Sequence, residues 1–199
     1  MNDTGKILVV DLESTCWDTH RGFPPKGQMS EIIEIGVCLL DSNTWERSAK
    51  KSILVKPSWS KVSQFCTELT TLTQEQVDQG VSFPEALQIL EQEYDSKSRL
   101  WMSWGDYDRK MFENQCRISN LAYPFSDKHI NAKQLEADHS GRPHQKKLGM
   151  VRAMAFHNLN PEGTHHRGDD DAWNIALILS KILPKIDFNP WPSFQLEQE

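Results

Sequence analysis

The sequence predicts a mixed α/β fold within one domain. Short runs rich in β-branched residues occupy the first part of the chain, and amphipathic segments with helix-capping signals follow, separated by further apolar runs. Strands that alternate with helices in this way are typical of α/β domains. At 199 residues the chain can enclose one hydrophobic core without disulfides. We therefore expect one domain over residues 1–183 and an extended tail over 184–199.

Three strands are expected early in the chain, and two shorter ones later. The first is rich in Val and ends in acidic residues, as a buried strand that leads into a site would. A Gly- and Pro-rich loop over 19–29 separates it from the second, and a turn at 41–43 leads to the third, so these three should form an antiparallel meander. The five expected strands span residues 6–12, 31–41, 50–57, 98–104 and 129–133.

Five helices are expected, and two of them begin with clear capping signals. Thr73 can cap the first, which Gly80 can end, and Ser82 stands two residues before Pro84 at the start of the second. The last helix is the most apolar and stops before Pro184. The five expected helices span residues 71–80, 82–94, 106–118, 146–156 and 169–183.

The charge balance argues against a protein that coats long stretches of duplex nucleic acid. Lys and Arg total 22 against 28 Asp and Glu, which gives a net charge of -6, whereas such proteins present a basic face to the phosphates. An enzyme that grips a few nucleotides at a strand end remains possible, because bound metal ions reverse the local field.

The N-terminal and cysteine patterns predict a cytoplasmic protein with reduced thiols. Residues 1–15 hold only a short apolar run that ends at Asp11, which fits neither a signal peptide nor a membrane span. The four cysteines are widely spaced and contain no C-x-x-C pair. We expect them to be structural thiols.

Two acids end the first expected strand and form the first candidate site. Asp11 and Glu13 lie two residues apart, so both carboxylates leave the same face of the strand. Neighbouring anions repel each other, and hard divalent cations relieve this repulsion. A solvated strand end with both acids in water is an equally good interpretation of this short motif taken alone.

A second acidic pair lies where the 98–104 strand meets the next helix. Strand ends in α/β sheets are common places for functional sites. Asp108 stands in the first turn of that helix, so its carboxylate is expected to point back over the sheet edge, whereas Asp106 is expected to cap the helix.

Three consecutive acids open the last helix. Negative charge at a helix N-terminus also complements the helix dipole, so the run has a purely structural interpretation. Only Asp171 shares the helix face of Ile175 and Leu179, four and eight residues later, and it alone is expected to face inward. A histidine in the preceding loop, His165 or His166, can reach the same place.

The three patches together predict hydrolysis of a phosphodiester. Four carboxylates can hold two metal ions that stabilise the attacking and leaving oxygens of an in-line displacement, and an imidazole can accept the proton of the attacking water. The combination is far more specific than any of its parts.

These residues resemble the DEDDh 3′→5′ exonucleases. The resemblance rests on D-x-E in the first strand, an aromatic residue and Asp before a helix, and a His five positions before Asp in the last helix. The stretches VVDLESTCWD, EIIEIGV, WGDYD, LGMV and HRGDDDAWNIA look most like the enhanced-RNAi branch, which includes histone-mRNA 3′-end exonucleases and KapD-like proteins. The match covers about residues 6–183 and implies an RNase H-like fold, a five-stranded mixed sheet flanked by helices.

The resemblance also implies roles for individual residues. His166 would be the general base, since it, unlike His165, stands five residues before Asp171. The cofactor would be two Mg²⁺ or Mn²⁺ ions. Their implied ligands are Asp11, Glu13, Asp108 and Asp171. Eri-type enzymes often carry Gly after the residue matching Thr70, where this chain has Thr71, so a loop near the substrate is expected to differ.

The expected substrate is the 3′ end of a nucleic acid, with RNA favoured over DNA. Met29 and Ile32, together with Glu13 and the loop in the 60s and 70s, are the expected walls of the terminal-nucleotide pocket. Two alternatives stay open: a DNA-directed exonuclease, and a non-catalytic KapD-like regulatory protein. All five side chains of the site are present, which favours an enzyme.

Overall fold

The computed structural model describes residues 5–19, 24–142, 145–186 and 188, and its centre is a five-stranded mixed sheet in the order β3-β2-β1-β4-β5. Adjacent members of the first three strands are antiparallel, while β4 runs parallel to β1 and β5 parallel to β4. The predicted class and the predicted meander are confirmed. The strands are β1 (Lys6–Ser14), β2 (Ile32–Asp41), β3 (Arg47–Leu54), β4 (Trp101–Ser103) and β5 (His129–Asn131).

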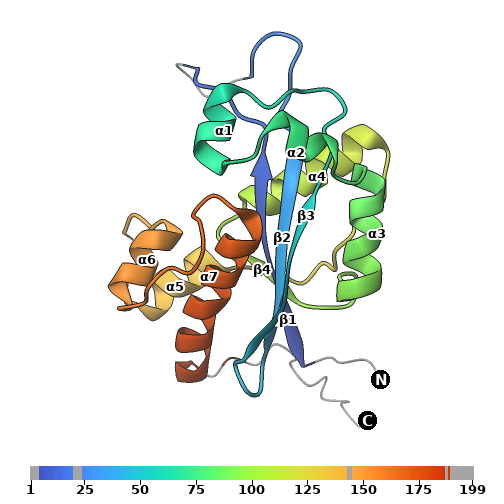
Figure 1. Ribbon diagram of the computed structural model, residues 1–199. Coiled ribbons are helices and arrows are strands. Elements are labelled where there is room, and N and C mark those ends of the chain that lie inside the picture. Colours follow the sequence, from blue (N-terminus) through green and yellow to red (C-terminus); the bar gives the residue numbers. More distant parts are fainter. Residues whose placement is uncertain (1–4, 20–23, 143–144, 187, 189–199) are drawn as a thin grey trace, which may run out of the picture.

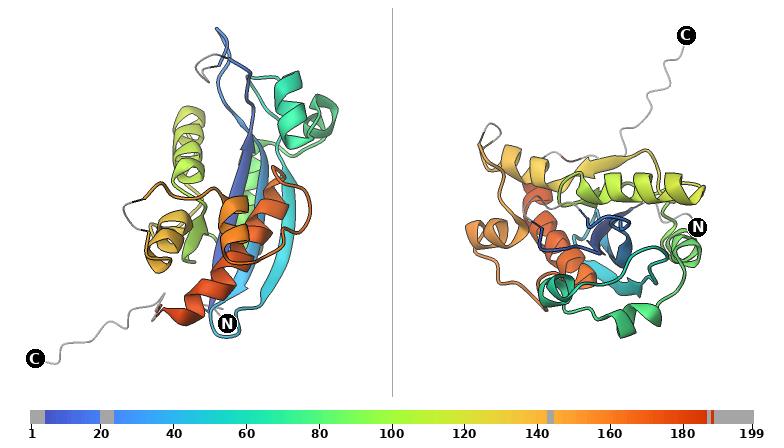
Figure 2. Two further views of the ribbon diagram at one scale, coloured as in Figure 1. Left: turned by 90° about the vertical axis from the view of Figure 1, so that its left-hand side faces the viewer. Right: turned by 90° about the horizontal axis from the view of Figure 1, so that it is seen from above.

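Helices cover both faces of this sheet (Figure 1). The α5, α6 and α7 helices lie on one face and α3 and α4 on the other, while α1 and α2 sit beside one end of the strands, as the views in Figure 2 also show. The helices are α1 (Gln64–Thr70), α2 (Gln74–Asp78), α3 (Phe83–Tyr94), α4 (Tyr107–Ser119), α5 (Ala132–His139), α6 (Met150–Phe156) and α7 (Gly168–Ile182), with a 3-10 turn at Leu183–Lys185.

The central strand β1 is buried on both faces. Leu8 and Val10 pack in the core shared with α3 and α4, and Ile7 and Val9 pack in the core shared with α7. Side chains alternate along a strand, so a strand with apolar residues at successive positions needs cover on both sides. This burial is what makes the acids that end β1 costly without a counter-charge.

Two helices, α1 and α5, were not predicted from the sequence. The α1 helix buries only Cys66 and Thr70, and α5 buries Ala132, Glu136 and Ala137, so neither shows an apolar stripe. Their formation depends on packing against the rest of the fold. In addition, α6 begins only at Met150, because residues 145–149 are not helical and its N-cap Gly149 has an extended backbone.

Parts of the predicted loop and tail cannot be compared with the structure. Residues 20–23 of the 19–29 loop, and residues 187 and 189–199 of the 184–199 tail, lie outside the described residues. Within the part of the chain that the structure describes, no helix has the length and apolar character needed to cross a membrane.

Candidate active site

A cleft of about 320 Å³ lies where the ends of β1, α4 and α7 meet, and it contains four carboxylates. We call it the acidic cleft. Its lining consists of Asp11, Leu12, Glu13, Trp104, Tyr107, Asp108, Gly149, Met150, His165, His166 and Asp171. The three predicted acidic patches, which are far apart in sequence, therefore meet at one place.

The β1 acids face the first turns of α7. Oxygen atoms of Asp11, Glu13 and Asp171 all lie within 4.8 Å of one another. Burial, followed by the charges of neighbouring carboxylates, raises the pKa of Asp11 well above its ordinary value and that of Glu13 to about 8. Without a cation, the anionic forms of these acids are strongly disfavoured.

The second acidic pair is divided between two environments. Asp108 is buried and its Oδ1 accepts a hydrogen bond from the Leu12 amide at 3.1 Å, inside the acidic cleft. Burial raises its pKa to about 6. Asp106 is the N-cap residue of α4 as expected, but its side chain makes no capping bond; instead it accepts a hydrogen bond from Asn131 at 3.0 Å. Of the two acids, only Asp108 lines the acidic cleft.

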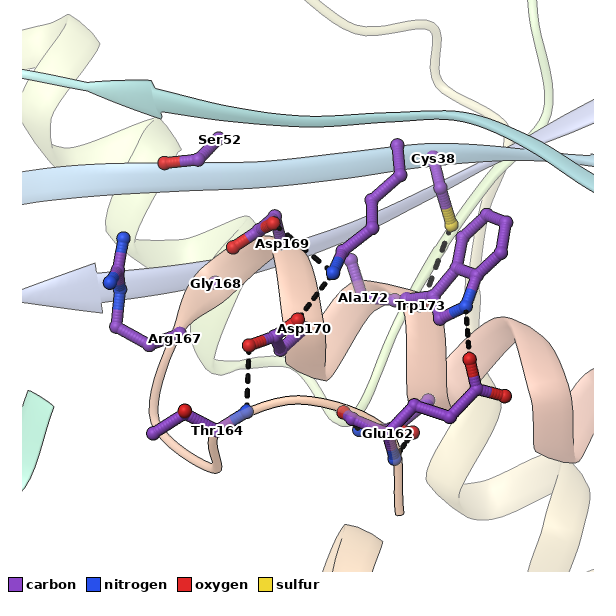
Figure 3. Close-up of polar contacts among 12 residues, drawn as sticks. Cys38, Ser52, Glu162, Thr164, Arg167, Gly168, Asp169, Asp170, Ala172 and Trp173 are labelled. Atoms are coloured by element: carbon purple, nitrogen blue, oxygen red, sulfur yellow. Dashed lines mark hydrogen bonds and ion pairs between the residues drawn. The ribbon is translucent and has the colours of Figure 1, made fainter. Parts of the chain in front are cut away.

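The acidic run at the start of α7 is divided in the same way, and Figure 3 shows the contacts of Asp169 and Asp170. Lys50 of β3 pairs with both Asp169, at 3.3 Å, and Asp170. Asp170 also accepts a hydrogen bond from the Thr164 amide at 2.7 Å. Of the three acids, only Asp171 lines the acidic cleft, and it is 4% exposed. This is the inward position that the helix period predicts.

The N-terminus of α7 packs on β2 through contacts that were not predicted from the sequence. The α7 backbone at Gly168 approaches Gly36 so closely that a Cβ on Gly36 would lie 1.8 Å from the Gly168 carbonyl carbon. Beside this contact, the buried Glu34 carboxylate accepts hydrogen bonds from the Arg167 guanidinium and, at 2.8 Å, from the Gly168 amide. The signals available were a charged residue and a glycine inside an apolar strand.

The two histidines stack on each other at the rim of the cleft, with ring centroids 3.9 Å apart. His166 has a positive φ of 64°, which lets its amide donate to Asp171 at 3.0 Å. Its Nδ1 lies 3.9 Å from a Glu13 oxygen. Burial and the neighbouring His165 lower the pKa of His166 below its ordinary value. His165 is exposed to solvent, and its Nδ1 lies 2.9 Å from Asp171.

Of the expected pocket walls, Glu13 lines the acidic cleft, whereas Met29 and Ile32 do not. Ile32 has no exposed surface and packs in the core, so its side chain offers nothing to a nucleotide in this structure. Met29 is 37% exposed but does not line the acidic cleft. Tyr107 does line it, is 57% exposed, and shares a hydrogen bond with Ser14 at 2.9 Å. The sequence analysis used Tyr107 only as the aromatic residue before Asp108 and assigned it no role.

A family model described as Exonuclease, of the RNase T type, matches residues 8–179. The chain belongs to this exonuclease family. The human protein named 3'-5' exoribonuclease 1 is 33% identical to this chain over 187 residues, covering 89% of this chain and 52% of that one. A Bacillus subtilis protein named probable 3'-5' exonuclease KapD is 27% identical over 172 residues, covering 85% and 80%.

A solved structure supports the same family assignment. It is described as the nuclease domain of 3'hExo, a DEDDh family member, bound to rAMP; it is 30% identical, has a TM-score of 0.79, and covers 92% of this chain and 93% of that one. The predicted DEDDh relationship and RNase H-like fold are thereby confirmed. The chain spans about half the length of the mammalian 3'-5' exoribonucleases that it matches.

Proposed function

We propose that this chain is a divalent-metal-dependent 3′→5′ exonuclease that releases nucleoside 5′-monophosphates, with single-stranded RNA or a short 3′ overhang as its substrate. The observation that carries the proposal is the convergence of four carboxylates from three separate elements on one cleft, with Asp11, Glu13 and Asp108 all disfavoured as anions by burial. Perturbed acids that gather in a cleft are typical of catalytic sites.

The donor set fits two Mg²⁺ or Mn²⁺ ions. Hard cations prefer oxygen ligands, and all four groups are carboxylates. The proposed ligands are Asp11, Glu13, Asp108 and Asp171. When bound, such ions would polarise the phosphodiester and ease ionisation of the attacking water. The closeness of Asp11, Glu13 and Asp171 supports their sharing of a cation, since their oxygens lie within 4.8 Å of one another.

His166 is proposed as the general base. Its side chain lines the acidic cleft and is 39% exposed, so a water molecule can reach the ring. With Nδ1 turned toward Glu13, Nε2 is left to accept a proton. The lowered pKa keeps the imidazole neutral near pH 7, the form that can act as a base.

RNA is favoured because of what the relatives are named. The human relative is called an exoribonuclease, and two similar solved structures are described as bound to rAMP and as recognising the 3′ end of a histone mRNA stem-loop. A DNA-directed exonuclease would use the same acidic cleft, and a non-catalytic regulatory protein would have no use for an exposed imidazole beside four carboxylates.

Digestion of matched 3′-labelled RNA and DNA oligomers, with Mg²⁺, Mn²⁺ or EDTA, tests the proposal. We expect stepwise shortening from the 3′ end, released 5′-monophosphates, faster digestion of RNA, and no reaction in EDTA. The Asp11→Ala variant should be inactive and at least as stable as the wild type without metal, because it loses one of several repelling acids. Wild-type activity in Asp11→Ala would refute the metal site.

A further inference from the structure

A second groove, of about 510 Å³, adjoins the acidic cleft. Its lining residues lie on α5, on α6, in residues 146–149 and at His165. The α5 and α6 helices are on the α7 side of the sheet (Figure 1). We call it the basic groove. Its lining consists of Lys133, Lys146, Lys147, Leu148, Gly149, Met150, Val151, Arg152 and His165.

The charge of this groove stands out against the rest of the molecule. Four of its nine lining residues are Lys or Arg and none is acidic, in a chain whose net charge is -6. Within the described ranges, none of the four cations forms an ion pair, whereas Arg47, Lys50 and Arg167 are each paired with acids. Unpaired like charges that share a groove repel each other, so their placement favours an anionic ligand.

The basic groove and the acidic cleft are continuous. Gly149, Met150 and His165 line both. The wall between them is held in place by Trp104 of the cleft, whose indole N–H donates to the Leu148 carbonyl at 3.2 Å. A chain of phosphates that ends among the carboxylates can therefore pass directly into the field of the four cations.

We propose that the basic groove binds the phosphates of a single-stranded nucleic acid on the 5′ side of the bond that is cut. This inference rests on the proposed function, since it takes the acidic cleft as the place of the 3′ end. The groove supplies the attraction that the carboxylates lack, and it orients the strand with its 3′ end toward them. Repeated phosphates, rather than a single anion, account for four cations along one groove.

Lys146 and Lys147 provide the test, because both lie outside helices and neither lines the acidic cleft. For the double variant Lys146→Ala/Lys147→Ala, we expect KM for a labelled 12-nucleotide RNA or DNA to rise on the order of tenfold at 0.1 M salt, with kcat nearly unchanged. The slope of log affinity against log salt should fall by about 1.4, at about 0.7 for each lost phosphate contact on a single strand.

Two controls distinguish the effect of the basic groove from the effect of overall charge and from an effect on the hydrolysis step. The variant Lys181→Ala/Lys185→Ala removes the same charge from exposed residues at the other end of α7, and it should leave KM and the salt slope unchanged. A small chromogenic phosphodiester of a nucleoside 5′-phosphate has no upstream phosphates, so all three proteins should cleave it equally. Equal losses in both double variants, or a loss on the small ester in Lys146→Ala/Lys147→Ala, would overturn the proposal.

Binding measurements keep this inference distinct from the proposed function. Fluorescence anisotropy with the same oligomers needs no turnover, and it should show weaker binding by Lys146→Ala/Lys147→Ala even if no hydrolysis is seen. Uncharged methylphosphonate linkages placed just upstream of the terminal linkage should weaken binding to the wild type and have little effect on the variant. Equal effects on both proteins would overturn the groove assignment.

Discussion

The Arg167 guanidinium donates two hydrogen bonds to the buried Glu34 carboxylate, at 2.8 and 3.2 Å, where α7 packs on β2. Glu34 is the strand partner of Glu13, and the Arg167 carbonyl accepts the amide of Asp171 at 2.8 Å. The pair therefore links β2, whose neighbour β1 carries the proposed metal ligand Glu13, to the helix turn that carries Asp171. Its effect on catalysis would be one of position, since neither side chain lines the acidic cleft.

Glu34→Gln should destabilise the protein by about 2–3 kcal/mol. Breaking one side of a buried ion pair costs about 3–5 kcal/mol, and the partial exposure of Arg167, 26%, reduces that value. Urea unfolding measures this loss in the free energy of unfolding. Glu162→Gln is the matched control, because its ion pair with Arg47 has a half-exposed acid and should contribute less than about 1 kcal/mol. Equal effects of the two changes would contradict this reasoning.

Gly36→Ala should cost about 3 kcal/mol or more and lower kcat, although the residue does not line the acidic cleft. The added methyl group would overlap the Gly168 backbone, and backbone cannot move aside as a side chain can, so α7 must shift and carry Asp171 with it. Gly149→Ala is the steric control for stability alone, since its Cβ would meet no atom within 4 Å but the residue lines the acidic cleft. Thermal melts compare the two variants, and single-turnover rates compare Gly36→Ala with the wild type. Wild-type stability and rate in Gly36→Ala would show that α7 can shift on β2 without loss.

Asp108→Asn should abolish turnover, whereas Asp106→Asn should keep most of it. Asp108 is buried in the acidic cleft, and Asp106 contacts Asn131 and lies 3.8 Å from Arg109 outside it. Both changes are isosteric, so circular dichroism should report the same fold for each. Turnover and Mn²⁺ affinity are measured for both variants. Loss of both in Asp106→Asn, with near-normal values in Asp108→Asn, would assign the metal ligand to Asp106.

His166→Ala should lose about 10²–10⁴-fold in kcat while keeping metal and nucleotide affinity, as expected for one acid–base group. Part of the rate should return at higher pH, where water ionises without help. In the wild type, the rate should fall only as pH drops through a pKa below 6.5, because burial and His165 lower the pKa of His166. His165→Ala is the comparison; a larger loss there, or lost Mn²⁺ affinity in His166→Ala, would reassign the roles.

The metal-free protein should lose stability as pH rises from about 4.5 to about 8, because of Glu13. Its pKa is about 8 in the folded protein against an ordinary value of 4.5, so the folded state holds a proton that the unfolded state has released. This one group lowers stability by up to about 1.4 kcal/mol per pH unit in that window, and its stabilising contribution is complete only below it.

Glu13→Gln should reduce this slope, and the part that remains comes from Asp11 and Asp108, whose pKa values are also raised. Urea unfolding in EDTA at several pH values gives the comparison, and added Mg²⁺ at pH 8 should stabilise the wild type more than the variant. Parallel stability curves for the two proteins would mean that Glu13 is ionised in the metal-free fold and that its pKa is not raised.

The sequence by itself determined the strands and most helices, the acids that end β1, and the inward position of Asp171. These follow from side-chain periods of two in a strand and 3.6 in a helix, which are local properties of the chain. The order of acidic patches along these elements was also enough to indicate the family and the class of chemistry.

Only the tertiary structure decided which groups meet. Glu34 and Arg167 are 133 residues apart, and no local pattern distinguishes a charge that will be buried and paired from one that stays in water. The same holds for Lys50, which neutralises Asp169 and Asp170 and leaves Asp171 to the cleft. The four cations of the basic groove come from α5, α6 and the segment between them, so their shared field exists only once those helices pack against α7. Pairing and repulsion act through space rather than along the chain, and the packing of the helices on the sheet sets those distances.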